Sequence, residues 1–286
     1  MRGKIIWLAS YPKSGNTWFR IFLTSLLNGS EAGLDINDLN HTPIASSREV
    51  FECHTGLESS DLTHEEIDLL RPDVYRIHSR EAASTLYMKN HDAFTKTSGG
   101  EWLFPPEATK GVIYLVRNPL DVAVSFANHS SSSISRTVQR ICDEKQAFCD
   151  GKTGLRNQLR QKLLSWSQHV ESWLASPCDL CLLRYEDMKL NSLETFRKAV
   201  DFLELEKTDA EINQALESST IDKIQQQEAE NRFCEKPQRA QRFFRKGIVG
   251  DWRNHLTEAQ VEQIIDTHRV TMQKLGYLDQ NGVLTV

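Results

Sequence analysis

Residues 5–27 read IIWLASYPKSGNTWFRIFLTSLL and set the expected start of the fold. The first part, Ile5 to Ala9, is an apolar run with the length of a buried parallel strand. A polar turn over 10–16 follows, and apolar residues then recur at helical spacing from about Thr17. A strand, a tight loop and a helix in this order direct backbone N–H groups and the positive end of a helix dipole toward an anion. The stretch therefore predicts an α/β fold with an anion site at its first βα turn.

The loop also carries side chains that suit an anion. Lys13 supplies a mobile cation, and Ser14 and Thr17 supply hydroxyl donors. The nucleoside-triphosphatase pattern G-x-x-x-x-G-K-[S/T] is absent, because Lys13 precedes Gly15 and Ser10 stands where the first glycine belongs. Ordinary βα turns also contain Ser, Gly and Asn for conformational reasons, so the loop alone leaves that interpretation open.

The string YPKSGNTW, residues 11–18, resembles the 5′-phosphosulfate loop of the cytosolic-type sulfotransferases. Enzymes of that family move a sulfuryl group from 3′-phosphoadenosine 5′-phosphosulfate (PAPS) to a hydroxyl or amine, and adenosine 3′,5′-bisphosphate (PAP) is the product. The commonest family loop has Thr where Asn16 stands. The resemblance implies donor binding by Lys13, Ser14, Gly15, Asn16, Thr17 and Trp18, with Lys13 also catalytic.

Length, charge and cysteine content restrict the other classes of function. The 286 residues can bury a sizeable core, and we expect a single domain over 1–286. A net charge of −5 argues against a general nucleic-acid or anionic-membrane partner. The N-terminal apolar stretch is too short for a secretory signal, and no run approaches the roughly 18 apolar residues of a membrane span. Six sparse cysteines fit a reducing cytoplasm better than a disulfide scaffold.

Cys178 and Cys181 form a lone C-x-x-C with no second pair or histidine pair at zinc spacing. The motif runs into the apolar stretch 180–185, so strand packing is the favoured interpretation, with zinc or redox chemistry as the alternative. We expect no metal requirement. Whether Cys142 and Cys149 have a redox role is left open.

His91 is the candidate general base among nine histidines. It lies just past a strand expected over 85–89, at the edge where open α/β sheets bind ligands. A solvated loop histidine is the alternative. Lys89-Asn-His91 is similar to the K-[S/T]-H segment in which the family keeps its catalytic base. The resemblance implies His91 as base and Lys89 as an aid to the transferring sulfuryl oxygens, while His78, which lacks the preceding lysine, is the competitor.

A second string, residues 117–125, follows an apolar strand expected over 112–116. Arg117 stands at the end of this strand, and Ser125 lies two turns along a helix that Pro119 would begin. An arginine fork and a hydroxyl can bind a phosphate together, although an arginine in this place is often only a salt-bridge partner. RNPLDVAVS closely resembles the family's 3′-phosphate motif R-N-P-x-D-x-x-x-S. The resemblance implies that Arg117 and Ser125 hold the 3′-phosphate.

The acidic chain turns basic over 232–253, a pattern that usually marks a solvated face. Within it, RKGIVGDWRN, residues 245–254, is similar to the family's third signature, R-K-G-x-x-G-D-W-[K/R]-N, which closes over the 3′-phosphate. The resemblance implies roles for Arg245, Lys246 and Gly247, where the glycine allows close backbone approach to a ligand.

Two positions are implied near the adenine. Tyr185 begins a Y-E-D-M string similar to one in which the family's tyrosine approaches adenine, and a core tyrosine is the alternative. Ser219 stands where the family has a Thr-Ser-Phe that touches adenine, but Ile221 replaces the aromatic residue.

The resemblance spans the chain in family order and implies one α/β domain, with a parallel sheet of about five strands flanked by helices, similar to nucleotide kinases. Residues 180–185 are a further strand candidate. Residues 158–174 have helical spacing, and capping boxes predict helix starts at 63–66, 191–194, 208–211 and 257–260. We expect Pro72 to close the helix that begins near residue 63.

The acceptor site is the least determined part. Residues 28–60 and 129–160 are expected to be mobile substrate loops, and Gly151-Lys-Thr inside the second is treated as a decoy nucleotide loop. Trp102, Phe104 and Phe148 are candidates for an apolar wall. A small molecule with a hydroxyl is the expected acceptor, ahead of an amine, a glycan or a peptide. The family's dimer motif is absent around Thr137, so oligomeric state is left open.

Two alternatives belong to other classes of function. A phosphoryl-transferring kinase of related fold needs Mg²⁺, a triphosphate loop and a carboxylate after a strand, and neither the loop nor a persuasive carboxylate is found. A catalytically silent nucleotide sensor would bind the donor without turnover.

Overall fold

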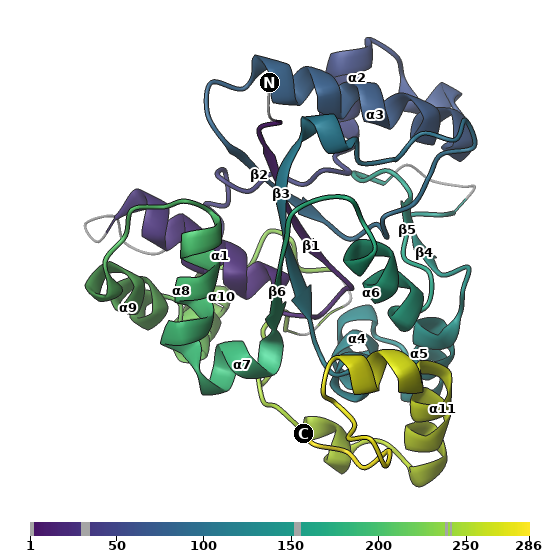
Figure 1. Ribbon diagram of the computed structural model, residues 1–286, viewed down its shortest axis with the longest axis vertical. Coiled ribbons are helices and arrows are strands. Elements are labelled where there is room, and N and C mark those ends of the chain that lie inside the picture. Colours follow the sequence, from purple (N-terminus) through teal and green to yellow (C-terminus); the bar gives the residue numbers. More distant parts are fainter. Residues whose placement is uncertain (1–2, 30–34, 152–155, 238–239, 241) are drawn as a thin grey trace. The chain divides into compact units, whose positions relative to one another are not determined.

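The computed structural model describes residues 3–29, 35–151, 156–237, 240 and 242–286. Its central element is a parallel sheet of four strands in the order β2-β1-β3-β6 (Figure 1). The strands are β1 (Ile5–Ser10), β2 (Leu86–Asn90), β3 (Thr109–Val116) and β6 (Leu180–Arg184). All of β1 and nearly all of β3 are buried, as expected for strands covered on both faces. Each strand lies on a stretch that the sequence predicted to be one.

Among the described residues the sheet has four strands rather than about five. At the outer edge of β2, the described residues form a single parallel bridge between Ile44 and Lys89. Around it, the N–H of Ala45 donates to the carbonyl of Lys89, and the N–H of Lys89 donates to the carbonyl of Pro43. Pro43 has no N–H of its own and a fixed φ, so this segment cannot extend into a ladder.

Contacts group the chain into two compact units, each assembled from three separate segments. The first unit comprises Met1–Tyr11, His41–Tyr114 and Asp143–Cys181. The second comprises Pro12–Asn40, Leu115–Cys142 and Leu182–Val286. The predicted donor-binding residues lie in the second unit, and Lys89 and His91 lie in the first.

The helices of the first unit come from two of its three segments. They are α2 (Arg48–Thr55), α3 (His64–Glu81) and α6 (Trp166–Leu174), with short 3₁₀ turns η1 (Ser59–Asp61) and η2 (Pro106–Ala108). Helices α2 and α3 lie side by side (Figure 1). A small antiparallel pair joins β4 (Ala147–Phe148) to β5 (Gln161–Lys162).

The second unit contains most of the helices. They are α1 (Asn16–Asn28), α4 (Pro119–Ser130), α5 (Ile134–Cys142), α7 (Tyr185–Leu190), α8 (Ser192–Phe202), α9 (Asp209–Ser218), α10 (Ile221–Asn231) and α11 (Glu258–Lys274), with the 3₁₀ turn η3 (Asp251–Asn254). Helix α4 contacts α5, α11 and η3, while α1 contacts α9. Pro119 stands in the first turn of α4, as predicted.

Helix α3 passes through Pro72 instead of ending there. The residue before a proline is biased away from helical φ and ψ, so the expectation was reasonable on local grounds. Arg71 is fully buried and its guanidinium pairs with Asp92 at 2.7 Å and with Asp68 at 3.5 Å. The Tyr75 hydroxyl accepts from the same guanidinium at 2.9 Å. This buried network stabilises the helix on both sides of the proline.

Helix starts were predicted with mixed success. Capping boxes begin α3 at Thr63, α9 at Thr208 and α11 at Thr257, as expected. The side chain of Asn191 makes no capping bond, so the predicted box there is wrong although a helix does begin. Helix α6 begins at Trp166 behind the cap Ser165, not at 158, because residues 161 and 162 pair with β4.

The two expected substrate loops contain regular structure. Residues 28–60 include α2 and the start of η1, and 129–160 include α5 and β4. Most of the decoy Gly151-Lys-Thr lies outside the described residues. Thr137, at the place of the family dimer motif, is fully buried in α5.

All six cysteines are free thiols, and Cys181 is buried on β6, in agreement with strand packing. Burial raises the pKa of the Cys142 and Cys149 thiols, which disfavours reactive thiolates. Within the described ranges, no group of histidine, cysteine and carboxylate side chains has the geometry of a metal site. No helix in the part of the chain that the structure describes is long and apolar enough to cross a membrane.

Candidate active site

The loop after β1 enters α1 through backbone conformations that side chains rarely adopt. Gly15 is the N-cap of α1 with φ 96°, and Lys13 has φ 73°. A Cβ atom at Gly15 would approach Cδ2 of Tyr185 to 2.8 Å, so a larger residue does not fit. No side chain caps α1. The helix therefore presents its positive end to the loop, as the sequence predicted.

Ser14 is fully buried, and its Oγ has no hydrogen-bond partner among the described residues. Burying a hydroxyl without a hydrogen bond costs on the order of 1–3 kcal/mol. Such a cost at the N-terminus of a helix fits a hydroxyl that binds an oxygen-rich ligand. Asn16 and Thr17 are also buried here.

Arg117 follows β3 and is only 8% exposed. Its Nη2 donates to the carbonyl of Ile248 at 2.9 Å, and its guanidinium lies 4.3 Å from the centroid of the Tyr185 ring. Its Nε has no hydrogen-bond partner in the described part of the chain. A buried guanidinium that is held on two sides and keeps an unsatisfied N–H can bind a further anion.

Asp121 joins the second motif to the third, a role that the sequence analysis did not assign. Its carboxylate accepts from the backbone N–H of Gly250 at 2.8 Å and of Trp252 at 3.0 Å. It also lies 3.5 Å from Nη2 of Arg117. The motif R-N-P-x-D-x-x-x-S includes this aspartate, but its partners lie more than a hundred residues away in the chain.

The segment that carries Arg245, Lys246 and Gly247 is held from two sides. On one side, α10 contributes Glu228, whose carboxylate accepts from the N–H groups of Phe243 at 2.6 Å and Phe244 at 3.0 Å. The side chain of Gln225 donates to the carbonyl of Phe244 at 3.1 Å and to that of Arg245. These two α10 residues were also missed by the sequence analysis.

On the other side, Asp251 accepts hydrogen bonds from the side chains of Arg245 and Lys246. Burial raises the pKa of the Asp251 carboxyl, but the bonds from these two cations outweigh it and hold the pKa well below its usual range. Asp251 is therefore ionised near neutral pH and orders both cations. Gly247 has φ 62°, and a Cβ atom there would meet the Tyr185 hydroxyl at 3.3 Å.

Tyr185 is the common neighbour of the three motifs. It is 6% exposed, begins α7, and lies against Gly15, Arg117 and Gly247. Trp18 packs edge-on against its ring at a centroid distance of 5.9 Å. Burial raises the pKa of its hydroxyl. Tyr185 is buried and also contacts all three motifs. A core tyrosine and a residue near the adenine are therefore compatible interpretations.

Ser125 and Ser219 are the remaining candidates for contacts with the phosphate and the adenine. Ser125 is half-buried on α4, two turns from Arg117. Ser219 is the C-cap of α9, and its hydroxyl donates into that helix to the carbonyl of Ala215 at 2.8 Å. Ile221 and Trp18 pack against one apolar cluster, so Ile221 occupies the region where an aromatic residue was expected.

Glu186 fixes the start of α4. Its carboxylate accepts from the N–H of Asn118 at 2.9 Å and from the hydroxyl of Tyr277 at 2.9 Å. Asn118 in turn caps α4 by accepting from the N–H of Leu120. Burial raises the pKa of the Glu186 carboxyl, and the bonds that it accepts oppose this shift. The Y-E-D-M string thus orients the arginine motif as well as supplying its tyrosine.

In the first unit, His91 lies directly after β2. Its Nδ1 is 2.9 Å from the carbonyl oxygen of Ser10, which can only accept. Nδ1 therefore carries the proton of the neutral ring, and Nε2 keeps the basic lone pair. The Phe148 ring stands edge to face with His91 at 6.5 Å. Lys89 lies on β2 and is 8% exposed.

A buried network orders the backbone at His91. Nε2 of His169 donates to the carbonyl of His91 at 3.1 Å, and the Tyr114 hydroxyl donates to Nδ1 of His169 at 2.7 Å. Burial lowers the pKa of His169 to about 3, so this histidine is neutral. The next residue, Asp92, pairs with Arg71. Neither His169 nor Arg71 was predicted to contact this segment, because both lie far from His91 in the sequence.

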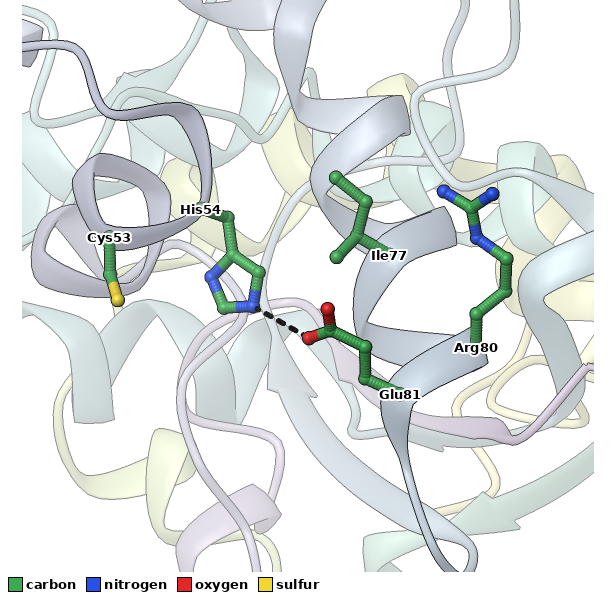
Figure 2. A pocket seen from close by; sticks show the side chains of 5 residues that line it. All are labelled: Cys53, His54, Ile77, Arg80 and Glu81. Atoms are coloured by element: carbon green, nitrogen blue, oxygen red, sulfur yellow. Dashed lines mark ion pairs between the residues drawn. The ribbon is translucent and has the colours of Figure 1, made fainter.

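His78 lies within α3 rather than at a strand end. Its ring stands 4.2 Å from that of His54, and burial together with His54 lowers its pKa. A cavity of about 440 Å³ opens nearby between α2 and α3, lined by Cys53, His54, Ile77, Arg80 and Glu81 (Figure 2). None of the predicted site residues lines it.

The three aromatic candidates for an acceptor wall lie in different surroundings. Phe104 is fully buried in a core with Trp7 and Tyr75, so it is not a wall residue. Trp102 packs on Phe94 at 4.7 Å. Phe148 alone of the three has its ring beside His91.

Comparison with known proteins settles the family. The family model described as "Sulfotransferase domain" matches residues 4–276. The chain belongs to the sulfotransferase family. This sulfotransferase is 26% identical to flavonol 3-sulfotransferase of Flaveria bidentis, with 95% of the chain and 81% of the relative covered. It is 32% identical to sulfotransferase 2A1 of Macaca fascicularis, with 89% and 79% covered.

Solved structures show the same fold. A mouse sulfotransferase complexed with PAP matches this sulfotransferase with a TM-score of 0.60 and 21% identity, over 96% of this chain and 85% of that one. Retinol dehydratase in a complex with retinol and PAP matches with a TM-score of 0.62 and 20% identity, over 96% and 82%.

Proposed function

We propose that this sulfotransferase moves the sulfuryl group of PAPS to a hydroxyl of a small-molecule acceptor and releases PAP. The observation that carries the proposal is the buried cluster around Tyr185. There, Ser14 Oγ, Trp18 Nε1 and Arg117 Nε are buried without hydrogen-bond partners among the described residues. Side chains left in this condition in one place are typical of a site built for a polar ligand.

The residues present fit the donor. The loop from Lys13 to Thr17 and the start of α1 would bind the 5′-phosphosulfate. Arg117, with Ser125, Arg245 and Lys246, would bind the 3′-phosphate, and Gly247 would let the backbone approach it. Trp18 and Tyr185 would contact the adenine, and Ser219 is the remaining candidate there.

In the proposed reaction, the acceptor oxygen attacks sulfur in line. Its proton passes to Nε2 of His91, whose tautomer leaves that nitrogen basic. The bond between sulfur and the bridging oxygen breaks, and the electron pair stays on the 5′-phosphate of PAP. Lys13 stabilises the negative charge that grows on this oxygen, while Lys89 assists the sulfuryl oxygens.

The acceptor and the cellular location extend the proposal. Phe148 would line the acceptor site beside His91, which suits an apolar small molecule with a hydroxyl group. The name of flavonol 3-sulfotransferase states the acceptor of that relative alone, and the assay below identifies the acceptor of this chain. A cytoplasmic location stays a prediction from the six free cysteines.

The test compares donors with a panel of phenols, alcohols and amines as acceptors. We expect transfer of label from [³⁵S]PAPS to a hydroxyl acceptor and none from ATP with Mg²⁺. Phosphoryl transfer from ATP would favour a kinase instead. Tight binding of PAP without turnover on any acceptor would favour a nucleotide sensor.

A further inference from the structure

Lys13 meets two side chains that none of the donor motifs assigns. Its Nζ lies 3.3 Å from Nδ1 of His129 and 4.3 Å from the centroid of the Phe243 ring. The two rings contact each other edge to face, with centroids 5.4 Å apart and an interplanar angle of 81°. All three residues belong to the second unit. They come from the loop after β1, the last turn of α4 and the segment before Arg245.

The chemistry of the contact fixes the direction of the hydrogen bond. An ammonium group can only donate, so Nδ1 of His129 accepts and Nε2 carries the proton of the neutral ring. An ammonium has three N–H groups, so a bond to one imidazole nitrogen is compatible with bonds to ligand oxygens. The face of Phe243 adds a cation–π attraction without using an N–H group.

The supports of the two rings are rigid. His129 lies one turn beyond Ser125 on α4, whose first turn is fixed by the Asn118 cap and by Glu186. Phe243 is held through its backbone N–H, which donates to the buried carboxylate of Glu228 at 2.6 Å. Ordered partners matter for a lysine, because its flexible stem carries about 2 kcal/mol of rotamer entropy.

We propose that His129 is a positioning residue that, with Phe243, aims the Lys13 ammonium at the leaving-group oxygen. The inference rests on the proposed function and adds to it a residue outside the donor motifs. Electrostatic stabilisation of a transition state depends on a donor that is already in place when the charge develops. Without the His129 nitrogen, Lys13 stays charged but is no longer held toward the leaving-group oxygen. Substitution of His129 should therefore lower turnover more than donor affinity.

Three substitutions separate the hydrogen bond from the volume of the ring. His129→Asn keeps an acceptor oxygen close to the place of Nδ1, His129→Phe keeps the ring without an acceptor, and His129→Ala removes both. Asn128→Ala, at an exposed neighbouring position of α4, is the matched control. Thermal unfolding of each variant checks that it is folded.

The first readouts are steady-state kinetics with PAPS and a phenol, and calorimetry with PAP. His129→Phe and His129→Ala should lower kcat about tenfold or more. This loss is part of the roughly 10²–10³-fold that one electrostatic donor contributes to kcat. The dissociation constant of PAP should stay within about threefold, because most of the groups proposed to bind PAP do not involve His129, whereas the charge that Lys13 meets on the bridging oxygen develops in the transition state. His129→Asn should recover most of the lost kcat, and Asn128→Ala should match the wild type.

A double-mutant cycle with Lys13→Ala tests whether His129 acts through the lysine. In the Lys13→Ala background, His129→Ala should cost nothing further in kcat. A further loss as large as that in the wild-type background would overturn the proposal, as would an Asn variant no better than the Phe variant. PAP binding that falls in parallel with kcat would also overturn it. Wild-type turnover with PAPS is measured first and tests the proposed function separately; its absence would remove both.

Discussion

Tyr185 shows at the residue scale how one buried side chain connects motifs that are far apart in the sequence. Its ring limits position 15 to glycine and stacks against the guanidinium of Arg117. Its hydroxyl lies close to Gly247. Arg117 is thus oriented by an aromatic face and by the carbonyl of Ile248 before any ligand arrives. Preorganised cations of this kind bind phosphate with little loss of side-chain entropy.

Arg117→Ala should weaken binding of PAP at least tenfold, since a charge-assisted hydrogen bond contributes about 1.5–3 kcal/mol. Adenosine 5′-monophosphate lacks the 3′-phosphate, so its affinity should hardly change. Isothermal calorimetry with both nucleotides measures the difference. Arg184→Ala is the control, because Arg184 also stacks on a tyrosine, Tyr277, but has no predicted ligand. Equal losses for both nucleotides would show that Arg117 is structural.

His91→Ala should lower kcat by about 10²–10⁴-fold, the usual contribution of a general base, and leave PAP affinity intact. Part of the loss should vanish with an acidic nitrophenol, because an acceptor that is already ionised needs no base. His78→Ala is the control and should be mild. A dead but folded His78 variant beside a nearly active His91 variant would move the base to α3.

At the element scale, α4 and the turn η3 act as one piece because Asp121 binds two backbone N–H groups of the third signature. The same signature is held from the other side by Gln225 and Glu228 of α10. The cations Arg245 and Lys246 are therefore carried on a segment that is braced at both ends. Their placement depends on these braces more than on the local conformation of the loop.

Asp121→Ala should loosen this segment, because it leaves the N–H groups of Gly250 and Trp252 without their acceptor, at about 1–3 kcal/mol for the buried N–H of Trp252. We expect faster hydrogen exchange over 245–254 and PAP affinity reduced about tenfold or more. Asp266→Ala, which removes an exposed carboxylate of α11 paired with Arg269, is the control. Unchanged exchange over 245–254 would contradict the bracing role.

At the scale of the whole molecule, two buried histidines make stability depend on pH. Burial lowers the pKa of His169 to about 3 and that of His268 to about 4. In the unfolded chain both would take up a proton near pH 6.5. Below that pH the unfolded state therefore binds more protons than the folded state, and the free energy of unfolding falls as pH falls.

Urea unfolding between pH 7.5 and 4.5 should show this loss, up to about 1.4 kcal/mol per pH unit for each histidine below pH 6. His268→Gln should flatten the dependence, because glutamine does not titrate. His64→Gln, at a surface position paired with Asp150, should leave the slope unchanged. A slope that is the same in all three proteins would show that other groups dominate.

The four strands and the helix start after the first loop could be predicted because they are local properties. A short apolar run between turn residues forms a buried strand almost regardless of its partners, and a glycine with positive φ beside a helix start is coded by a few adjacent residues. The prediction that the helix ends at Pro72 was wrong, because it considered only the local sequence. Arg71 gains its stabilising partner from Asp92, which periodicity cannot reveal.

Only the tertiary structure decided how the site residues are held. The carbonyl of Ser10, 81 residues earlier, accepts from Nδ1 of His91 and so determines its tautomer. Nζ of Lys13 contacts Nδ1 of His129, 116 residues later. Asp121, Glu186 and Glu228 were missed because a buried carboxylate that binds backbone N–H groups looks in sequence like any other acidic residue. The sequence by itself predicted which groups would bind an anion, and it determined the order in which they occur. Their orientation and tautomers depend on contacts between distant segments, which form only when the chain has folded.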